Sequence, residues 1–157
     1  MLKAEQETVR VLLVENDAAA EEAIQEALQS LRCETLGVAR TGQEAIRKAR
    51  KLDPDIILMD IDLPNFGGIT AIQRIYERRP VPVVALTAHD SPDLVVRAST
   101  AGAGAYLVKP PSPAALNQAI TIARARFHDI VELHRLNAEL RSELVERKRA
   151  EARLSDS

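Results

Sequence analysis

The sequence predicts a doubly wound α/β fold with a five-stranded parallel sheet and an extended C-terminal helix. Short apolar runs, each too short for a helix and bounded by proline, glycine or polar residues, alternate with segments of helical spacing. The last of these segments runs from Pro113 to Leu154 with neither glycine nor a further proline, far beyond a typical globular helix. Together these patterns indicate five βα units and one unusually long helix.

The segment from Pro54 to Pro64 is the clearest strand. Ile56 to Met59 form an apolar run that is typical of a strand buried on both faces of a parallel sheet. Asp60 directly follows the run. In open α/β sheets, ligands bind just outside the carboxyl ends of the strands, so Asp60 lies where such a fold does its chemistry.

The other elements follow from the same patterns and from their capping and turn residues. Before Pro54 they are a strand over 9–14 (VRVLLV), a helix over 18–32 that Asn16 or Asp17 can cap, a strand over 34–39 and a helix from Thr41-Gly42 to about Lys51. After Pro64 they are a turn at Asn65–Gly68, a helix over 69–78, a strand over 83–86 that stops at Thr87, a helix from Asp90-Ser91-Pro92 that breaks at Gly102 and Gly104, a strand over 105–108 and the helix that opens at Ser112-Pro113. Right-handed crossovers favour the strand order 2-1-3-4-5.

Polar residues follow four of these strands. They are Glu15 and Asn16 after the first strand, Asp60 after the third, Thr87 after the fourth and Lys109 after the fifth. In the predicted order these four strands are neighbours, so their polar residues surround one crevice. A single threonine or lysine at a strand end is usually solvated scaffold, but this set suits phosphoryl transfer to the Asp60 carboxylate, with a Mg²⁺ ion on neighbouring oxygens.

Composition excludes several other classes of protein. The net charge of −2 gives no case for a general nucleic-acid or membrane binder. Cys33 is the single cysteine, which rules out an internal disulfide, and its expected role is that of a small packed residue. No apolar run approaches the roughly 20 residues of a membrane span, and the polar N-terminus lacks a signal-peptide core. We therefore expect a cytoplasmic protein.

From Val9 to about Ile122 the chain resembles a bacterial two-component response-regulator receiver domain of the CheY-like family. The segments that carry the resemblance are VLLVEND, PDIILMDIDLPNFGGI, PVVALTAHD and AGAGAYLVKP. The resemblance implies phosphorelay signalling, in which Asp60 accepts a phosphoryl group from a sensor histidine kinase while Thr87 and Lys109 bind that group. It also implies a signalling domain with at most slow autodephosphorylation and no other enzymatic activity.

The resemblance assigns further roles to the same segments. The metal ligands it implies are Asp60, Glu15, Asn16 and the backbone carbonyl of Asp62. Lys109-Pro110 is expected to be a cis peptide. Tyr106 falls at the family's rotating aromatic, which with Thr87 couples phosphorylation to the face formed by the helix before strand 105–108, that strand and the helix after it. A half-buried strand tyrosine is the alternative interpretation of Tyr106.

The sequence departs from the family pattern at Asn16 and Gly67. The family usually has an aspartate at the position of Asn16, and asparagine keeps an oxygen but loses the charge. We therefore expect weakened Mg²⁺ binding. Asp17 could substitute as a ligand, although a helix cap is its expected role. At Gly67 the family often has a polar residue, and glycine there eases the turn.

The tail of the chain carries a heptad pattern. The expected dimer seam consists of Ile130, Leu133, Asn137, Leu140 and Leu144. Asparagine at an a position favours two parallel strands, whereas Arg147 and Glu151 continue the register poorly. The predicted organisation is therefore an N-terminal tail (1–8), a receiver domain (9–123) and an extended helix (124–157), which forms a homodimeric coiled coil. A solvated, fraying helix is the alternative.

Three other functions remain open. The tail could link to an absent output domain, because LVERKRAEARL (144–154) resembles linker helices of sensory or kinase modules and the first helix of RNA-binding ANTAR domains. Basic residues of the tail are offset by acids, so RNA binding by this chain alone is not expected. A degenerate receiver could act by docking alone. An aspartate-nucleophile phosphatase of the haloacid dehalogenase type matches Asp60-Ile61-Asp62, but that family places its nucleophile on the first strand.

Overall fold

The structure, a computed structural model, describes residues 7–64 and 67–156 of the chain. Its strands are β1 (Arg10–Val14), β2 (Glu34–Ala39), β3 (Ile56–Asp60), β4 (Val83–Thr87) and β5 (Ala105–Val108). Its helices are α2 (Ala18–Ser30), α3 (Gly42–Leu52), α4 (Gly68–Arg78), α5 (Pro92–Ala101) and α6 (Pro113–Asp156). Residues 1–6 of the expected tail, and Asn65 and Phe66 of the expected turn, lie outside the described residues.

The five strands form one parallel sheet in the order β2-β1-β3-β4-β5. This confirms the predicted fold class and strand order. Starting from β1, the chain adds β2 on one side and then β3, β4 and β5 on the other. β1 and β3 are therefore neighbours at the point where the order of the strands reverses. Such a switch point opens a crevice at the carboxyl ends of the strands.

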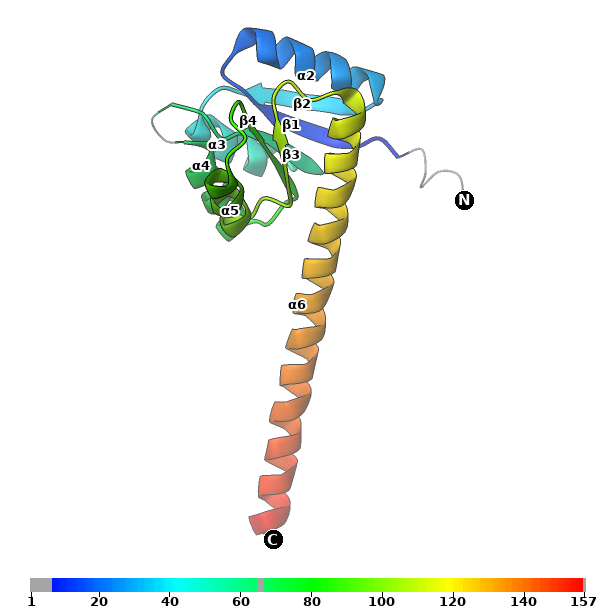
Figure 1. Cartoon of the computed structure of the whole chain (residues 1–157). Helices are drawn as coiled ribbons and strands as arrows, with labels where there is room; N and C mark the ends of the chain where they lie inside the picture. Colours follow the sequence, from blue (N-terminus) through cyan, green and yellow to red (C-terminus); the bar gives the residue numbers. More distant parts are fainter. Residues whose placement is uncertain (1–6, 65–66, 157) are drawn as a thin grey trace. The chain divides into compact units, whose positions relative to one another are not determined.

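The sheet is covered on both faces, which explains its continuous apolar strands. Ile57 and Met59 of β3 pack in a core with helices α3, α4 and α5. Ile56 and Leu58 face the other way and pack with α2 and with the first turns of α6, where Leu116 is fully buried. Figure 1 shows α2 on one side of the sheet and α3, α4 and α5 on the other.

The first residues of α2 and α4 lie close to the carboxyl edge of the sheet. The Asp17 carboxylate accepts a hydrogen bond from the Ala20 N–H at 2.8 Å and so caps α2. At the start of α4, a Cβ atom on Gly68 would lie 2.2 Å from the carbonyl oxygen of Asp60. Only glycine therefore allows α4 to pack directly against the end of β3. Gly67 precedes it with a φ of 81°, a backbone conformation that favours glycine.

The chain divides into two compact units, residues 1–124 and 125–157. The second unit consists of the later turns of α6, and most of its large apolar side chains are exposed, among them Leu133 and Leu140 of the expected seam. Arg135 forms ion pairs along this helix with Glu132 and Glu139. Within the described ranges, no helix combines the length and the apolar character that crossing a bilayer requires.

Candidate functional site

The parallel register brings the polar strand ends to one edge of the sheet. Asp60, the last residue of β3, pairs with Leu86 of β4, so Thr87 lies one residue beyond it on the neighbouring strand. Thr87 in turn pairs with Val108 of β5, and the Lys109 N–H donates to the Thr87 carbonyl at 2.7 Å. The Lys109–Pro110 peptide bond is cis, as the resemblance implies.

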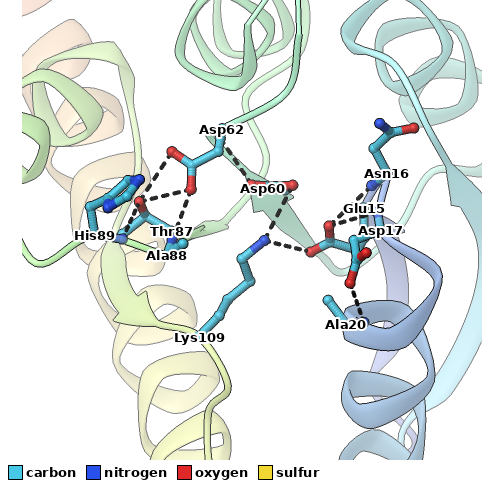
Figure 2. A network of polar contacts seen from close by, with 10 residues as sticks. All are labelled: Glu15, Asn16, Asp17, Ala20, Asp60, Asp62, Thr87, Ala88, His89 and Lys109. Carbon is cyan, nitrogen blue, oxygen red and sulfur yellow. Dashed lines mark hydrogen bonds and ion pairs between the residues drawn. The ribbon is translucent and has the colours of Figure 1, made fainter.

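An ammonium group joins two buried carboxylates at this edge. Among the described residues, the buried polar or charged side chains are Glu15, Asp60 and Thr87. The Lys109 Nζ atom lies 3.1 Å from Glu15 Oε1 and 3.3 Å from Asp60 Oδ2. Figure 2 shows the lysine side chain reaching between the two acids. The structure therefore brings Glu15, Asp60 and Lys109 together, as the sequence predicts.

Burial and crowding change the proton affinity of the Asp60 carboxylate. The pKa of Asp60 is raised to about 6. Burial is the largest cause, and the hydrogen bond to Glu15 and repulsion by its charge act in the same direction. The Asp62 N–H, which donates to Asp60 Oδ1 at 2.9 Å, and the Lys109 ammonium oppose this increase. Burial lowers the pKa of Lys109, but its hydrogen bond to Glu15 and the attraction of both acids outweigh burial and leave the pKa above its usual value. The site thus holds more negative charge than one ammonium balances.

The Thr87 hydroxyl is held by the side chain of Asp62, for which the receiver resemblance implies only a backbone role. The Thr87 hydroxyl lies 3.1 Å from Asp62 Oδ2 and 3.2 Å from Oδ1, and the Ala88 N–H donates to Oδ2 at 2.8 Å. The side chain of Asp62 thus bridges from the end of β3 to the end of β4 (Figure 2). The position of an aspartate two residues after Asp60, beside a neighbouring strand that ends in threonine, is the signal that could have revealed this contact.

Tyr106 connects to the same loop. Its hydroxyl donates to the His89 carbonyl at 2.6 Å and accepts from the Ser91 N–H at 3.4 Å. The His89 N–H donates in turn to the Thr87 hydroxyl oxygen at 3.1 Å. The Tyr106 ring is half-buried and packs against the core. A chain of hydrogen bonds therefore runs from Asp62 through Thr87 and residues 89–91 to Tyr106.

The loop after β1 holds Glu15 in place and leaves Asn16 exposed. The backbone N–H groups of Asn16 and Asp17 both donate to Glu15 Oε2 at 3.1 Å. The Asn16 side chain extends away from the Lys109 ammonium in Figure 2. Asp17 caps α2, which confirms the role expected for this residue.

The donor set fits a hydrated Mg²⁺ ion. Mg²⁺ usually keeps several waters and is held through one or two carboxylates, and Asp60 and Glu15 supply two buried ones with excess negative charge. Over the described residues, no cluster of three or more His, Cys, Asp or Glu side chains is arranged to hold a metal. The remaining ligands would be the carbonyl oxygen of Asp62, water and, once its side chain turns from the direction seen in Figure 2 towards the site, the amide oxygen of Asn16. These oxygens carry no charge.

Comparisons with known proteins agree with this geometry. The model of the response regulator receiver domain family matches residues 11–121. The transcriptional regulatory protein PdtaR of Mycobacterium tuberculosis H37Rv is 42% identical over 142 residues, which cover 90% of this chain and 69% of PdtaR. The probable C4-dicarboxylate response regulator DctR of Halalkalibacterium halodurans is 31% identical over 98% of this chain and 67% of its own length. The signal receiver domain of a modulated diguanylate cyclase from Desulfovibrio desulfuricans G20 superposes with a TM-score of 0.71, at 30% identity, over 78% of this chain and 98% of that domain.

Proposed function

The chain belongs to the response regulator receiver domain family, and from this premise we propose that Asp60 accepts a phosphoryl group from a sensor histidine kinase in the cytoplasm. Receiver domains work with such kinases and typically bind Mg²⁺ where they are phosphorylated. The observation that carries the proposal is the contact of the Lys109 ammonium, at 3.3 Å, with a carboxylate that is only 4% exposed at the switch point of the sheet.

In the proposed reaction, an Asp60 carboxylate oxygen attacks phosphorus. A P–O bond forms to Asp60 while the bond from phosphorus to the donor breaks, and the leaving group keeps that electron pair. Charge on the phosphoryl oxygens is offset by Lys109, which already lies between Asp60 and Glu15. A bound Mg²⁺ ion would supply additional positive charge at this site. The neutral amide of Asn16 makes that ion weakly held.

Exposure to acetyl phosphate and Mg²⁺, followed by intact mass measurement, tests the proposal. We expect one long-lived phosphoryl adduct on the wild-type chain and none on Asp60→Asn. Asp90→Asn is the matched control, because it removes one carboxylate from an exposed position in the loop after β4. No adduct at any Mg²⁺ concentration would favour the degenerate receiver, and multiple turnover of a small phosphoester would favour the phosphatase.

The proposed output is a change in the face formed by α5, β5 and the first turns of α6. Tyr106 lies on β5, and its hydroxyl is bonded to the loop that leads from Thr87 into α5. This face carries exposed apolar side chains, of which Val96 on α5 is 63% exposed. A phosphoryl group that moves Thr87 would act on Tyr106 through this loop and change what the face binds.

We also propose that residues 124–157 of α6 pair two chains as a parallel coiled coil. The seam residues Leu133 and Leu140 are 62% and 54% exposed, so they have apolar surface for a partner helix to cover. A linker to a further output domain is the alternative, which similarity to a transcriptional regulatory protein favours. Direct nucleic-acid binding by this chain alone, or association with a membrane, is not part of the proposal.

A further inference from the structure

The hydrogen-bond donors beside Asp60 already hold an anion. A phosphoryl group on Asp60 needs donors for its charged oxygens, and the edge of the sheet offers the Lys109 ammonium, the Thr87 hydroxyl and the Ala88 N–H. Lys109 contacts Asp60 itself. The other two donors are directed to the Asp62 carboxylate, at 3.1 Å and 2.8 Å.

Asp62 is suited to this position by its backbone. Its N–H donates to Asp60 Oδ1 at 2.9 Å, which fixes residue 62 directly beside the reacting carboxylate. From there its side chain places two carboxylate oxygens near the Thr87 hydroxyl. Residue 62 is exposed as a whole, so its carboxylate can leave these donors and be hydrated at low cost.

A phosphoryl group and Asp62 cannot share these donors without repulsion, because both carry negative charge. We propose that the Asp62 carboxylate occupies the Thr87 and Ala88 donors in the resting protein and is displaced when Asp60 is phosphorylated. Asp62 is then a positioning residue that limits phosphoryl occupancy and holds the segment from Thr87 to Ser91 in its resting hydrogen bonds. This inference rests on the proposed phosphorylation of Asp60.

The test compares Asp62→Asn and Asp62→Ala with the wild-type chain. Beryllium fluoride with Mg²⁺ serves as the phosphoryl mimic, and amide NMR signals of Ala88 and His89 report binding. Because charge-assisted hydrogen bonds are about twice as strong as neutral ones, we expect half-saturation of Asp62→Ala at about tenfold lower beryllium fluoride. Asp62→Asn keeps an acceptor oxygen without the charge and should fall between the two.

Two controls separate this role from a structural or a general electrostatic one. A variant that merely loosens the fold would bind the mimic more weakly, whereas displacement of a competitor predicts tighter binding, so the sign of the change decides. Asp90→Asn removes the same charge from an exposed position in the loop after β4, and no hydrogen bond within the described ranges ties Asp90 to the site. It should bind like the wild-type chain. The Ala88 signal should also shift in free Asp62→Ala, as the amide loses its carboxylate acceptor.

The outcomes distinguish this inference from the function on which it depends. Tighter binding in both Asp62 variants, with Asp90→Asn unchanged, supports displacement. Equal or weaker binding in well-folded Asp62 variants refutes it and leaves phosphorylation of Asp60 intact. The third outcome is that no chain, including the wild type, binds beryllium fluoride or accepts a phosphoryl group from acetyl phosphate. That outcome overturns the proposed function and this inference with it.

Discussion

Replacing Asp60 with asparagine should make the protein more stable at neutral pH, although it removes the proposed phosphoacceptor. The carboxylate is 4% exposed, and its pKa of about 6 lies about two units above the value of 3.8 for a free aspartate. Each unit corresponds to about 1.4 kcal/mol, so ionised Asp60 costs the folded state up to about 3 kcal/mol. The attraction of Lys109 is already included in that pKa. Allowing for relaxation of the site, we expect the free energy of unfolding to rise by about 1–3 kcal/mol.

The direction of the pH dependence follows from the raised pKa. The folded chain keeps the Asp60 proton up to about pH 6, whereas the unfolded chain releases it near 3.8. The stability of the wild-type chain therefore falls, relative to that of Asp60→Asn, as the pH rises through this window. The gap, meaning the difference in free energy of unfolding between the two chains, reaches its full size above about pH 7. Urea unfolding of both chains from pH 4.5 to 8, without divalent cations, measures the gap. Added Mg²⁺ should stabilise the wild-type chain and narrow it.

A stability difference that does not change between pH 4.5 and 8 would refute the reasoning, because the difference would then not arise from the ionisation of Asp60. So would a variant that is less stable than the wild type at pH 7.5. Asp90→Asn, which removes an exposed acid, serves as the control and should change stability by less than about 0.5 kcal/mol.

The remaining predictions concern the metal, the packing of α4 and the tail. Asn16→Asp restores a charged ligand and should lower the half-saturating Mg²⁺ concentration about tenfold in an NMR titration; no change would contradict the assignment of this residue to the metal. Gly68→Ala places a Cβ 2.2 Å from the backbone at the end of β3 and should lower the free energy of unfolding, measured in urea, by about 3 kcal/mol. The Cβ of Gly37→Ala meets only the end of a side chain, at 3.2 Å, so this variant should lose less stability. Leu140→Asp, on the expected seam, should convert a dimer to a monomer in light scattering. Val145→Asp, at a similarly exposed position off the seam, should not, and equal effects of the two variants would rule out the seam.

Much of the fold was predictable because its strands are buried on both faces. A run such as Ile56 to Met59 has one stable environment, and the polar residue after each run marks where a strand ends. Strand order then brings Asp60, Thr87 and Lys109 to one edge whatever the details of the loops. Helix ends were less predictable: the expected helix over 18–32 ends at Ser30, because Leu31 caps it and Arg32 takes a positive φ of 61°.

The directions of side chains in the loops could not be predicted in the same way. Asp62 and Asn16 follow strands and are exposed, so neither burial nor periodicity determines where their side chains point. The hydrogen bonds from Thr87 and Ala88 decide the direction of the Asp62 carboxylate, and those donors lie at the end of β4, 25 and 26 residues later in the chain. A contact of this kind appears only when the register of the neighbouring strands is known.

Asp60 is the residue that we propose becomes phosphorylated. Treatment of the acetyl phosphate-labelled chain with borohydride reduces an aspartyl phosphate to homoserine, and peptide sequencing by tandem mass spectrometry then locates it. We predict homoserine at position 60 and aspartate unchanged at positions 55, 62 and 90. A phosphoryl adduct that forms while position 60 remains aspartate would contradict the account.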